Sequence, residues 1–212
     1  SLHDALPICP NDNIGITLFA GESFTQCPLT VDHAVLLDMI HNIKCGLIED
    51  GTAVGMGIAN AVTRLKDSKA KSKVIILLTD GTNNKGDISP MTAAEIAKSF
   101  GIRVYTIGVG TNGMAPYPYP VGNTVQYVSM PVEIDEKTLT QIAGTTDGNY
   151  FRATSNSKLK EVYEEIDKLE KTKLNVKEYS KRDEEYHWFA LAAFLCVLLE
   201  VLLRNSILKK IP

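Results

Sequence analysis

Two short segments of the sequence place an oxygen-bearing side chain at the end of a strand or the start of a helix. Asp80 follows the aliphatic run 74–78 after one residue, Thr79, and Thr52 stands at the start of a helical pattern. A carboxylate and a hydroxyl that meet at one rim of a sheet suit a hard cation such as Mg²⁺, which takes oxygen ligands and keeps some of its waters. One alternative needs no metal, because Asp80 can close a turn and Thr52 can cap a helix. Another is a Mg²⁺-dependent phosphotransfer enzyme with Asp80 as nucleophile, for which Lys85 and Asp87 are the only nearby partners.

Two other enzyme-like patterns fail on their context. Residues 108–113 match G-x-G-x-x-G after a strand, but prolines at 116, 118 and 120 forbid the helix that a dinucleotide site requires. Ser23 lies in Gly-Glu-Ser, which lacks the second glycine of a nucleophile elbow. No histidine follows a later strand to complete a triad, so a serine hydrolase has no support.

The composition narrows the class of protein. The 212 residues carry 22 basic and 25 acidic side chains, a formal net charge of −3, and 44% are hydrophobic. This balance is typical of a folded globular chain and excludes a globally basic nucleic-acid binder. The four cysteines form no C-x-x-C pair, so a zinc ribbon or thioredoxin-type site has no support. Cys27 and Cys45 could pair in an oxidising periplasm, although two buried thiols are the default expectation.

The elements that must position Thr52 and Asp80 alternate between strand and helix. We expect strands over 14–19, 24–29, 74–78, 102–109 and 150–152. We expect helices after an N-cap at Thr30, over 52–65, between Ser89 and Gly101, from Asp135 to Gly144, and along the stripe from Leu159 to Leu169. The alternation predicts an α/β fold with a doubly wound, mostly parallel sheet, in which ligands bind beyond the carboxyl ends of the strands. The five consecutive aliphatic residues at 74–78 predict a strand buried on both faces.

At these residues the sequence resembles the von Willebrand factor A (VWA) domain. The similarity lies in Leu-Leu-Thr-Asp-Gly at 77–81, in the segment 50–62 and in Ile-Gly-Val-Gly at 107–110, and it extends over about residues 10–170. The resemblance implies a metal-ion-dependent adhesion site, with Thr52 and Asp80 as metal ligands and Mg²⁺ as cofactor. It also implies a non-catalytic role in metal-dependent protein–protein interaction. The alternative is a metal-independent structural membrane adaptor.

One part of the family's pattern does not occur in this sequence. The family's Asp-x-Ser-x-Ser loop should lie upstream of Pro10, and the nearest string, Glu22-Ser23, follows the wrong strand. The family's first strand lies at the centre of the sheet, between the strands expected at 14–19 and 74–78. Two strand edges should then be unpaired, at about 1–3 kcal/mol for each buried backbone group without a partner. We therefore expect this chain to fold poorly and to bind Mg²⁺ weakly or not at all.

The resemblance narrows to the BatA-type membrane VWA proteins of bacterial aerotolerance operons. The residues that carry it include Phe-Ala-Gly-Glu-Ser-Phe at 19–24, Met-Thr-Ala-Ala-Glu at 91–95 and Met-Pro-Val-Glu-Ile at 130–134. It implies a stress-related complex with other membrane VWA proteins, tetratricopeptide proteins and a MoxR-type ATPase. It implies the bacterial inner membrane as location, and the short C-terminal tail favours a cytoplasmic tail and a periplasmic VWA domain.

The segments outside the VWA region, which we place at 9–170, have different origins. Residues 1–8 resemble a translated sequencing adapter, so we exclude them and expect an N-terminally truncated chain. Residues 171–185 are expected to form a charged connector, and 205–212 a basic tail. Residues 186–204 are apolar apart from a few positions such as Glu200, which predicts a transmembrane helix. The alternative for this run is a buried helix of a soluble domain.

The segment from Thr111 to Pro131 combines prolines at 116, 118 and 120 with tyrosines beyond an expected strand end. Tyr117 and Tyr119 are therefore candidates for contact with a partner protein. The alternative is a surface hairpin stiffened by proline.

Overall fold

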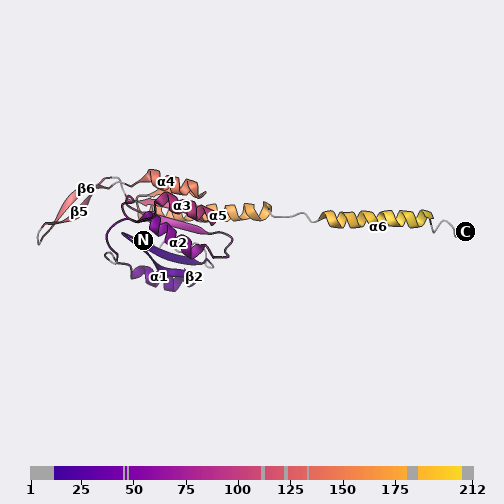
Figure 1. The fold of residues 1–212 in the computed structure, drawn as a ribbon, viewed down its shortest axis with the longest axis horizontal. Helices are drawn as coiled ribbons and strands as arrows, with labels where there is room; N and C mark the ends of the chain where they lie inside the picture. The colour runs from indigo at the N-terminus through magenta and orange to yellow at the C-terminus, as the bar shows by residue number, and fades with distance from the viewer. Residues whose placement is uncertain are drawn as a thin grey trace. The chain divides into compact units, whose positions relative to one another are not determined.

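The structure is a computed structural model of the chain. It describes residues 12–44, 46, 48–110, 113–121, 124–132, 134–180 and 186–206. The chain divides into two compact units, Ser1–Lys171 and Thr172–Pro212 (Figure 1). The expected adapter segment 1–8 lies outside the described residues, as do positions 207–212 of the expected tail.

A three-stranded parallel sheet lies in the first unit. It holds β3 (Val74–Thr79), β4 (Arg103–Val109) and β7 (Tyr150–Ala153) in the order β3-β4-β7. The register of β3 on β4 runs unbroken from Val74 opposite Arg103 to Thr79 opposite Gly108. The strands expected at 74–78, 102–109 and 150–152 are thereby confirmed to within one residue at each end.

A second, antiparallel sheet is formed by β1 (Ile14–Phe19) and β2 (Ser23–Thr30). Both strands were expected, and β2 extends one residue beyond the expected range 24–29 at each end. Among the described strands, none pairs with the remaining edge of β1 or with that of β3. The continuous, doubly wound sheet predicted from the sequence is therefore present as two sheets, because a ladder of hydrogen bonds needs an adjacent strand.

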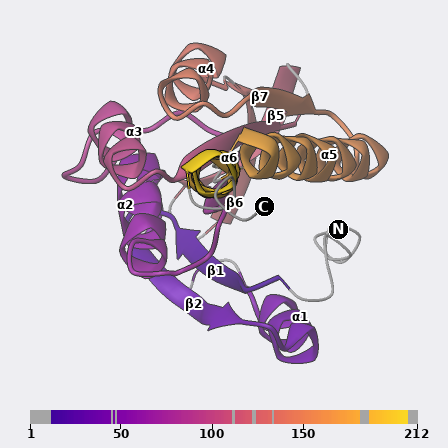
Figure 2. The same ribbon diagram turned by 90° about the vertical axis from the view of Figure 1, so that its right-hand side faces the viewer.

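Helices cover both faces of the parallel sheet. They are α2 (Val54–Leu65), α3 (Pro90–Ser99), α4 (Glu136–Thr145) and α5 (Asn156–Ser180), whereas α1 (His33–His41) lies against β1 and β2. Helices α2, α3 and α4 pack on one face of the parallel sheet, where the shared core includes Ile58, Ala94, Ile142, Ile75 and Val104. Helix α5 covers the other face and packs Val162 and Ile166 against Tyr105 and Ile107 (Figure 2).

The two neighbouring strands of the parallel sheet differ in burial. The central residues of β4, from Val104 to Ile107, are fully buried on both faces. In β3, by contrast, Ile75 and Leu77 are buried but the residues on the opposite face are only half-buried. The prediction of a strand buried on both faces therefore holds for one face of β3. Strand β4 has a neighbour at each edge, whereas β3 is paired at one edge only.

Two helix boundaries agree with the sequence prediction. Ser89 is the N-cap of α3 and accepts a hydrogen bond from the Thr92 N–H at 3.1 Å, with Pro90 as the first helical residue. Gly101 follows this helix with φ of +65°, a conformation that favours glycine. Asp135 caps α4 as expected and accepts the N–H of Thr138.

Two other boundaries differ from the prediction. The N-cap of α1 is Asp32, whose carboxylate accepts two backbone N–H groups, while the Thr30 hydroxyl instead accepts the N–H of Asp32. Helix α4 continues past Gly144 to Thr145. A Cβ at Gly144 would meet nothing within 4 Å, and its φ is not positive, so this glycine does not end the helix.

The proline-rich segment forms a hairpin. Strand β5 (Gly113–Val121) pairs antiparallel with β6 (Thr124–Val132). Tyr117 lies opposite Val128 and Tyr119 opposite Gln126 in this register. The hairpin interpretation is thus confirmed, while the side chains of both tyrosines lie outside the described part of the chain.

The second unit contains helical segments. Helix α5 continues through residue 180, so the first part of the expected connector at 171–185 is helical, and residues 181–185 lie outside the described ranges. Helix α6 (Tyr186–Ser206) covers the expected span at 186–204. The predicted transmembrane helix lacks support, because in the described part of the chain no helix is both long enough and apolar enough to cross a membrane.

Candidate functional site

Thr52 and the end of β3 lie next to each other in the structure. A Cβ placed on Gly81 would lie 3.4 Å from the hydroxyl oxygen of Thr52. Asp80, the residue before this glycine, is exposed at the carboxyl end of β3. The two loops that the sequence predicted to share one rim are therefore brought together.

The backbone of Thr52 is held by the loop that follows β3. Its N–H donates to Oδ1 of Asn84 at 2.8 Å, and its carbonyl accepts the N–H groups of Asn84 at 3.1 Å and Lys85 at 3.4 Å. The next helical N–H, that of Val54, donates to Oδ1 of Asn83 at 2.9 Å. Sequence reasoning missed both asparagines. The only feature of the sequence that could have indicated them is their position close to Asp80. Asparagines are common in many kinds of turn, so their residue type alone predicts no such role.

The metal-free alternative assigned a turn to Asp80 and a helix cap to Thr52, and in the structure other residues fill both of these roles. The N-cap of α2 is Ala53, and no side chain makes a capping hydrogen bond there, so Thr52 does not cap the helix. The turn after β3 is closed by the Thr79 hydroxyl, which accepts the N–H of Gly81 at 3.3 Å. The Thr52 hydroxyl and the Asp80 carboxylate are thus not the groups that form these local structures.

The oxygen ligands at this rim are of the right chemical type for a hard cation, but there are few of them. One hydroxyl and one exposed carboxylate are oxygen ligands, and Mg²⁺ requires about six in octahedral geometry. Within the described residues, no group of three or more His, Cys, Asp or Glu side chains is placed to hold a metal ion. Thr52 and Asp80 fit a cation in type, and water or another protein would have to fill the remaining positions.

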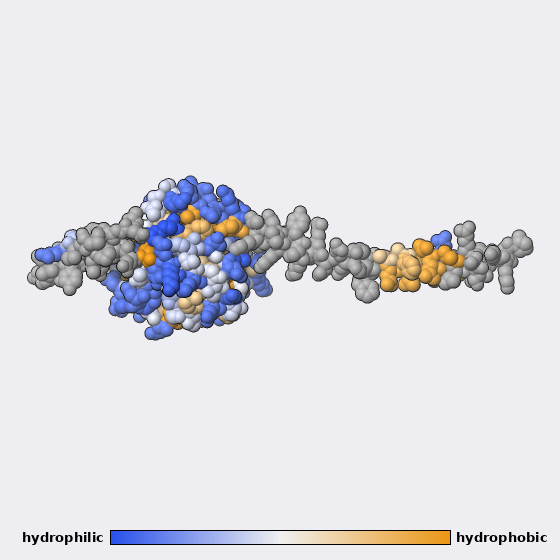
Figure 3. Space-filling view, turned by 90° about the horizontal axis from the view of Figure 1, so that it is seen from above, coloured by the Kyte–Doolittle hydropathy of each residue, from blue (hydrophilic) through white to orange (hydrophobic). Residues whose placement is uncertain are grey.

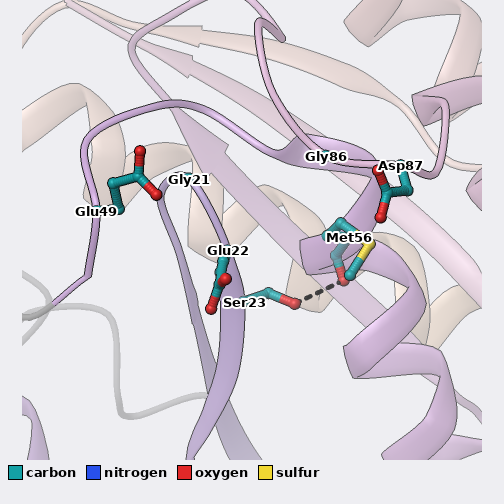
Figure 4. A pocket seen from close by; sticks show the side chains of 7 residues that line it. All are labelled: Gly21, Glu22, Ser23, Glu49, Met56, Gly86 and Asp87. Carbon is teal, nitrogen blue, oxygen red and sulfur yellow. Dashed lines mark hydrogen bonds between the residues drawn. The ribbon is translucent and has the colours of Figure 1, made fainter.

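A pocket of about 320 Å³ opens beside this rim. Figure 4 shows its lining from the start of β2, the loop before Thr52, the first turn of α2 and the loop after β3, with residues Gly21, Glu22, Ser23, Glu49, Met56, Gly86 and Asp87. Within it the hydroxyl of Ser23 donates to the carbonyl of Met56 at 3.0 Å. Three carboxylates give the pocket an acidic lining that sequence reasoning did not identify.

One of these carboxylates is paired with a cation. Lys85 Nζ donates to Oε1 of Glu49 at 2.5 Å, and this hydrogen bond and the lysine's charge hold the pKa of Glu49 below its usual range. Lys85 was the residue that a phosphotransfer site would have needed beside Asp80. Its pairing with Glu49 gives that chemistry no support.

A partly buried charge network ties the parallel sheet to α5. Arg103 pairs with Glu170, and each side chain is 14% exposed. Tyr105 and Ser72 also donate to this carboxylate, at 2.6 and 2.8 Å. Burial opposes ionisation of Glu170, but the hydrogen bonds from Arg103, Tyr105 and Ser72 outweigh it and lower its pKa. The network connects β4 and the segment before β3 to α5, and it includes neither Thr52 nor Asp80.

The possible pairing of Cys27 with Cys45 stays a prediction, because Cys45 lies outside the described residues. Cys27 is a buried free thiol of β2, with 2% of its surface exposed. Burial raises the pKa of this thiol.

Among solved structures, the chain is similar to two proteins from Bacteroides and to a mussel byssus protein. It is 31% identical to a protein described as BatB from Bacteroides thetaiotaomicron, with a TM-score of 0.67 and coverage of 80% of this chain and 85% of that one. It is 26% identical to an aerotolerance-related membrane protein from Bacteroides fragilis, with a TM-score of 0.66 and coverage of 79% and 84%. A mussel byssus protein, described with a zinc-occupied MIDAS motif, is 26% identical with a TM-score of 0.55 and coverage of 74% and 34%.

The curated relatives are longer than this chain. The chain is 25% identical to an uncharacterized protein of Borreliella burgdorferi over 95% of its own length but 59% of that protein's. It matches a UPF0353 protein of Mycolicibacterium paratuberculosis at 28% identity over 48% of that protein. The von Willebrand factor type A domain family matches residues 2–165. The chain therefore belongs to the von Willebrand factor type A domain family.

Proposed function

We propose that this chain is a non-catalytic protein–protein interaction module that uses a divalent cation at Thr52 and Asp80. The placement of Thr52 carries the proposal. Hydrogen bonds from and to Asn84 hold its backbone beside Gly81, and its hydroxyl is not used to cap α2. An exposed carboxylate and a hydroxyl at one rim suit a cation that keeps open positions for a partner's oxygen.

Mg²⁺ is the cation that this donor set favours. Hydroxyl and carboxylate oxygens are hard ligands, which suit Mg²⁺ better than metals that prefer thiolate or imidazole ligands. The mussel protein described with a zinc-occupied MIDAS motif supports divalent metal binding in a chain of similar fold. With only two protein oxygens the affinity of this chain for Mg²⁺ should be weak, and a carboxylate from a partner would strengthen it.

We also propose a setting and partners for this module. The similarity to an aerotolerance-related membrane protein supports association with a membrane and a role in a stress-related complex. Other membrane VWA proteins, tetratricopeptide proteins and a MoxR-type ATPase are the partners that the BatA-type resemblance implies. Tyr117 and Tyr119 belong to one strand of the β5–β6 hairpin, and we propose them as contact residues for a partner protein.

Carboxylate binding in the presence and absence of Mg²⁺ tests this function. The full chain is immobilised and exposed to a short glutamate-containing peptide, first with Mg²⁺ and then with a chelator. Binding should require Mg²⁺ and should disappear when glutamine replaces the glutamate. Equal binding of both peptides, or binding that survives chelation, would contradict the proposal.

A metal-independent adaptor is the second candidate. The observation that favours it is the lack of any three-ligand acidic, histidine or cysteine cluster among the described residues. An adaptor would bind its partners through the hairpin or the helices with no response to chelation. The same Mg²⁺ and chelator comparison therefore separates the two candidates.

A further inference from the structure

The loop between α2 and β3 carries a strong positive charge in a chain that is acidic overall. This basic loop, residues 66–73, has lysines at 66, 69, 71 and 73, and Asp67 is its one acidic residue. The whole chain, by contrast, has a formal net charge of −3. The side chains of Lys66, Lys69 and Lys71 are exposed, so their charges are presented on the surface of the first unit.

Hydrogen bonds hold the backbone of the basic loop. Lys73 Nζ donates to the carbonyl of Lys66 at 2.7 Å, so the loop is closed across its two ends. Between them, the N–H of Ser68 donates to the carbonyl of Leu65 at 3.0 Å, and its hydroxyl accepts the N–H of Ala70 at 3.3 Å. A ligand that binds the exposed lysines therefore does not have to order the loop, which lowers the entropic cost of binding.

The basic loop lies at the amino end of the parallel sheet. It leads directly into β3, and the N–H of Arg103, at the start of β4, donates to the carbonyl of Lys73 at 3.0 Å. Helix α5 brings two carboxylates to this end, but Glu170 pairs with Arg103 and Asp167 pairs with Lys171. These two carboxylates are thus compensated by cations outside the basic loop.

The opposite end of the same sheet is acidic. Asp80 follows β3 at its carboxyl end, and Glu22, Glu49 and Asp87 line the pocket beside it. Of these, Glu49 is paired with Lys85. The first unit is therefore polarised along β3, and an anionic surface would attract its amino end and repel its carboxyl end.

The chain leaves the first unit beside the basic loop. The hydroxyl of Ser72 in this loop donates to Glu170 at 2.8 Å, and the first unit ends one residue later, at Lys171. The second unit contains α6, which forms the orange run in Figure 3 and exposes apolar side chains such as Leu191 and Phe194. Exposed apolar surface of this extent favours contact with lipid or protein.

We infer that the basic loop binds the phosphate headgroups of an anionic membrane surface. The ammonium groups of Lys66, Lys69 and Lys71 would contact the headgroups and turn the amino end of the sheet towards the lipid. Thr52 and Asp80, at the carboxyl end, would then point away from the membrane, where a partner can reach them. The inference rests on the proposed association with a membrane, but it does not require the cation.

Vesicle binding by the full chain tests the inference. The vesicles consist of phosphatidylcholine alone or of phosphatidylcholine mixed with phosphatidylglycerol, and the bound fraction is measured by co-sedimentation. Each lysine close to an anionic surface strengthens binding by about fivefold, so three should give a preference of at least about tenfold for the anionic vesicles. This preference should disappear at about 1 M salt, where the Debye length is only about 3 Å.

Two triple variants with the same change in net charge locate the contact. Lys66→Gln, Lys69→Gln and Lys71→Gln together should abolish the preference. The control replaces three exposed lysines at the starts of α4 and α5, at the other end of the sheet, by Lys137→Gln, Lys158→Gln and Lys160→Gln. It should retain the preference. Thermal midpoints equal to that of the parent chain show that both variants are folded.

The outcomes separate this inference from the proposed membrane association. If the parent chain binds both kinds of vesicle equally, the association stands and the basic loop is not its contact surface. Binding to neither kind contradicts the association itself. A preference that survives in the basic-loop variant, or falls equally in the control, would overturn the inference. Tighter binding of a DNA duplex than of anionic vesicles would also overturn it, because the surface would then suit a nucleic acid.

Discussion

Asn84 holds Thr52 from both sides of its peptide backbone. The side-chain oxygen of Asn84 accepts the N–H of Thr52 at 2.8 Å, and the N–H of Asn84 donates to the carbonyl of Thr52 at 3.1 Å. This pair ties the loop after β3 to the loop before α2. The distance between the Thr52 hydroxyl and the end of β3 therefore depends on a residue that is not itself a candidate ligand.

Replacing Asn84 should weaken both the loop and the cation site. In Asn84→Ala the N–H of Thr52 loses its acceptor, and we expect a loss of about 1 kcal/mol in the free energy of unfolding, measured with urea. Cation affinity should fall as well. Thr82→Ala, an exposed change in the same loop, serves as the control and should alter neither quantity. If the two variants behave alike, Asn84 does not position Thr52.

The packing of α2 on the loop after β3 leaves no room for a side chain at Gly55. A Cβ there would lie 2.0 Å from the carbonyl oxygen of Ile88, a backbone atom that cannot move alone. We expect Gly55→Ala to lower the free energy of unfolding by about 2 kcal/mol or more. Gly144→Ala, where a Cβ meets nothing within 4 Å, should instead stabilise helix α4 by up to about 1 kcal/mol. Similar thermal midpoints for the two variants would show that α2 is packed differently.

The ion pair between Arg103 and Glu170 should contribute measurably to stability. Both side chains are 14% exposed, so Glu170→Gln leaves a largely buried guanidinium without its counter-charge. We expect a loss of about 3 kcal/mol in denaturant unfolding at neutral pH. Glu161→Gln, which breaks an exposed pair with Lys158, should have little effect.

The same pair makes stability depend on pH. Because the pKa of Glu170 is lowered in the folded chain, its ionised form stabilises the fold above the ordinary carboxyl pKa. That contribution should disappear as the pH falls through the lowered value. The difference between the parent chain and Glu170→Gln should therefore shrink in acid, and a difference that grows in acid would contradict the assignment.

Local signals in the sequence predicted single elements well. Ser89, Pro90 and Gly101 each have one strong conformational preference, and together they placed α3 correctly. Around α1, by contrast, Thr30 and Asp32 can both cap a helix, and the sequence does not show which one will. Residues 171–180 were expected as a connector, yet lysine and glutamate are good helix formers, so a charged run does not exclude a helix.

Long-range relationships could be predicted only in part. The placement of Thr52 beside the end of β3 was predicted from the strand end and the helix start and agreed with the motif resemblance. The roles of Asn83 and Asn84 were not predicted, because loop asparagines serve many turns. The separation of the two sheets depends on which strands stand beside β1 and β3. The half-buried face of β3 could not be predicted either, because the burial of an aliphatic strand depends on which elements pack beside it.

The most direct measurement is Mn²⁺ binding followed by electron paramagnetic resonance, with Mn²⁺ standing in for Mg²⁺. The full chain is compared with Asp80→Asn and with Asp87→Asn, a change of another exposed carboxylate beside the same rim. We predict weak binding by the parent chain, at about 1 mM, its loss in Asp80→Asn and its retention in Asp87→Asn. Equal binding by the parent and Asp80→Asn, or none by the parent in this range, would contradict the cation site at Thr52 and Asp80.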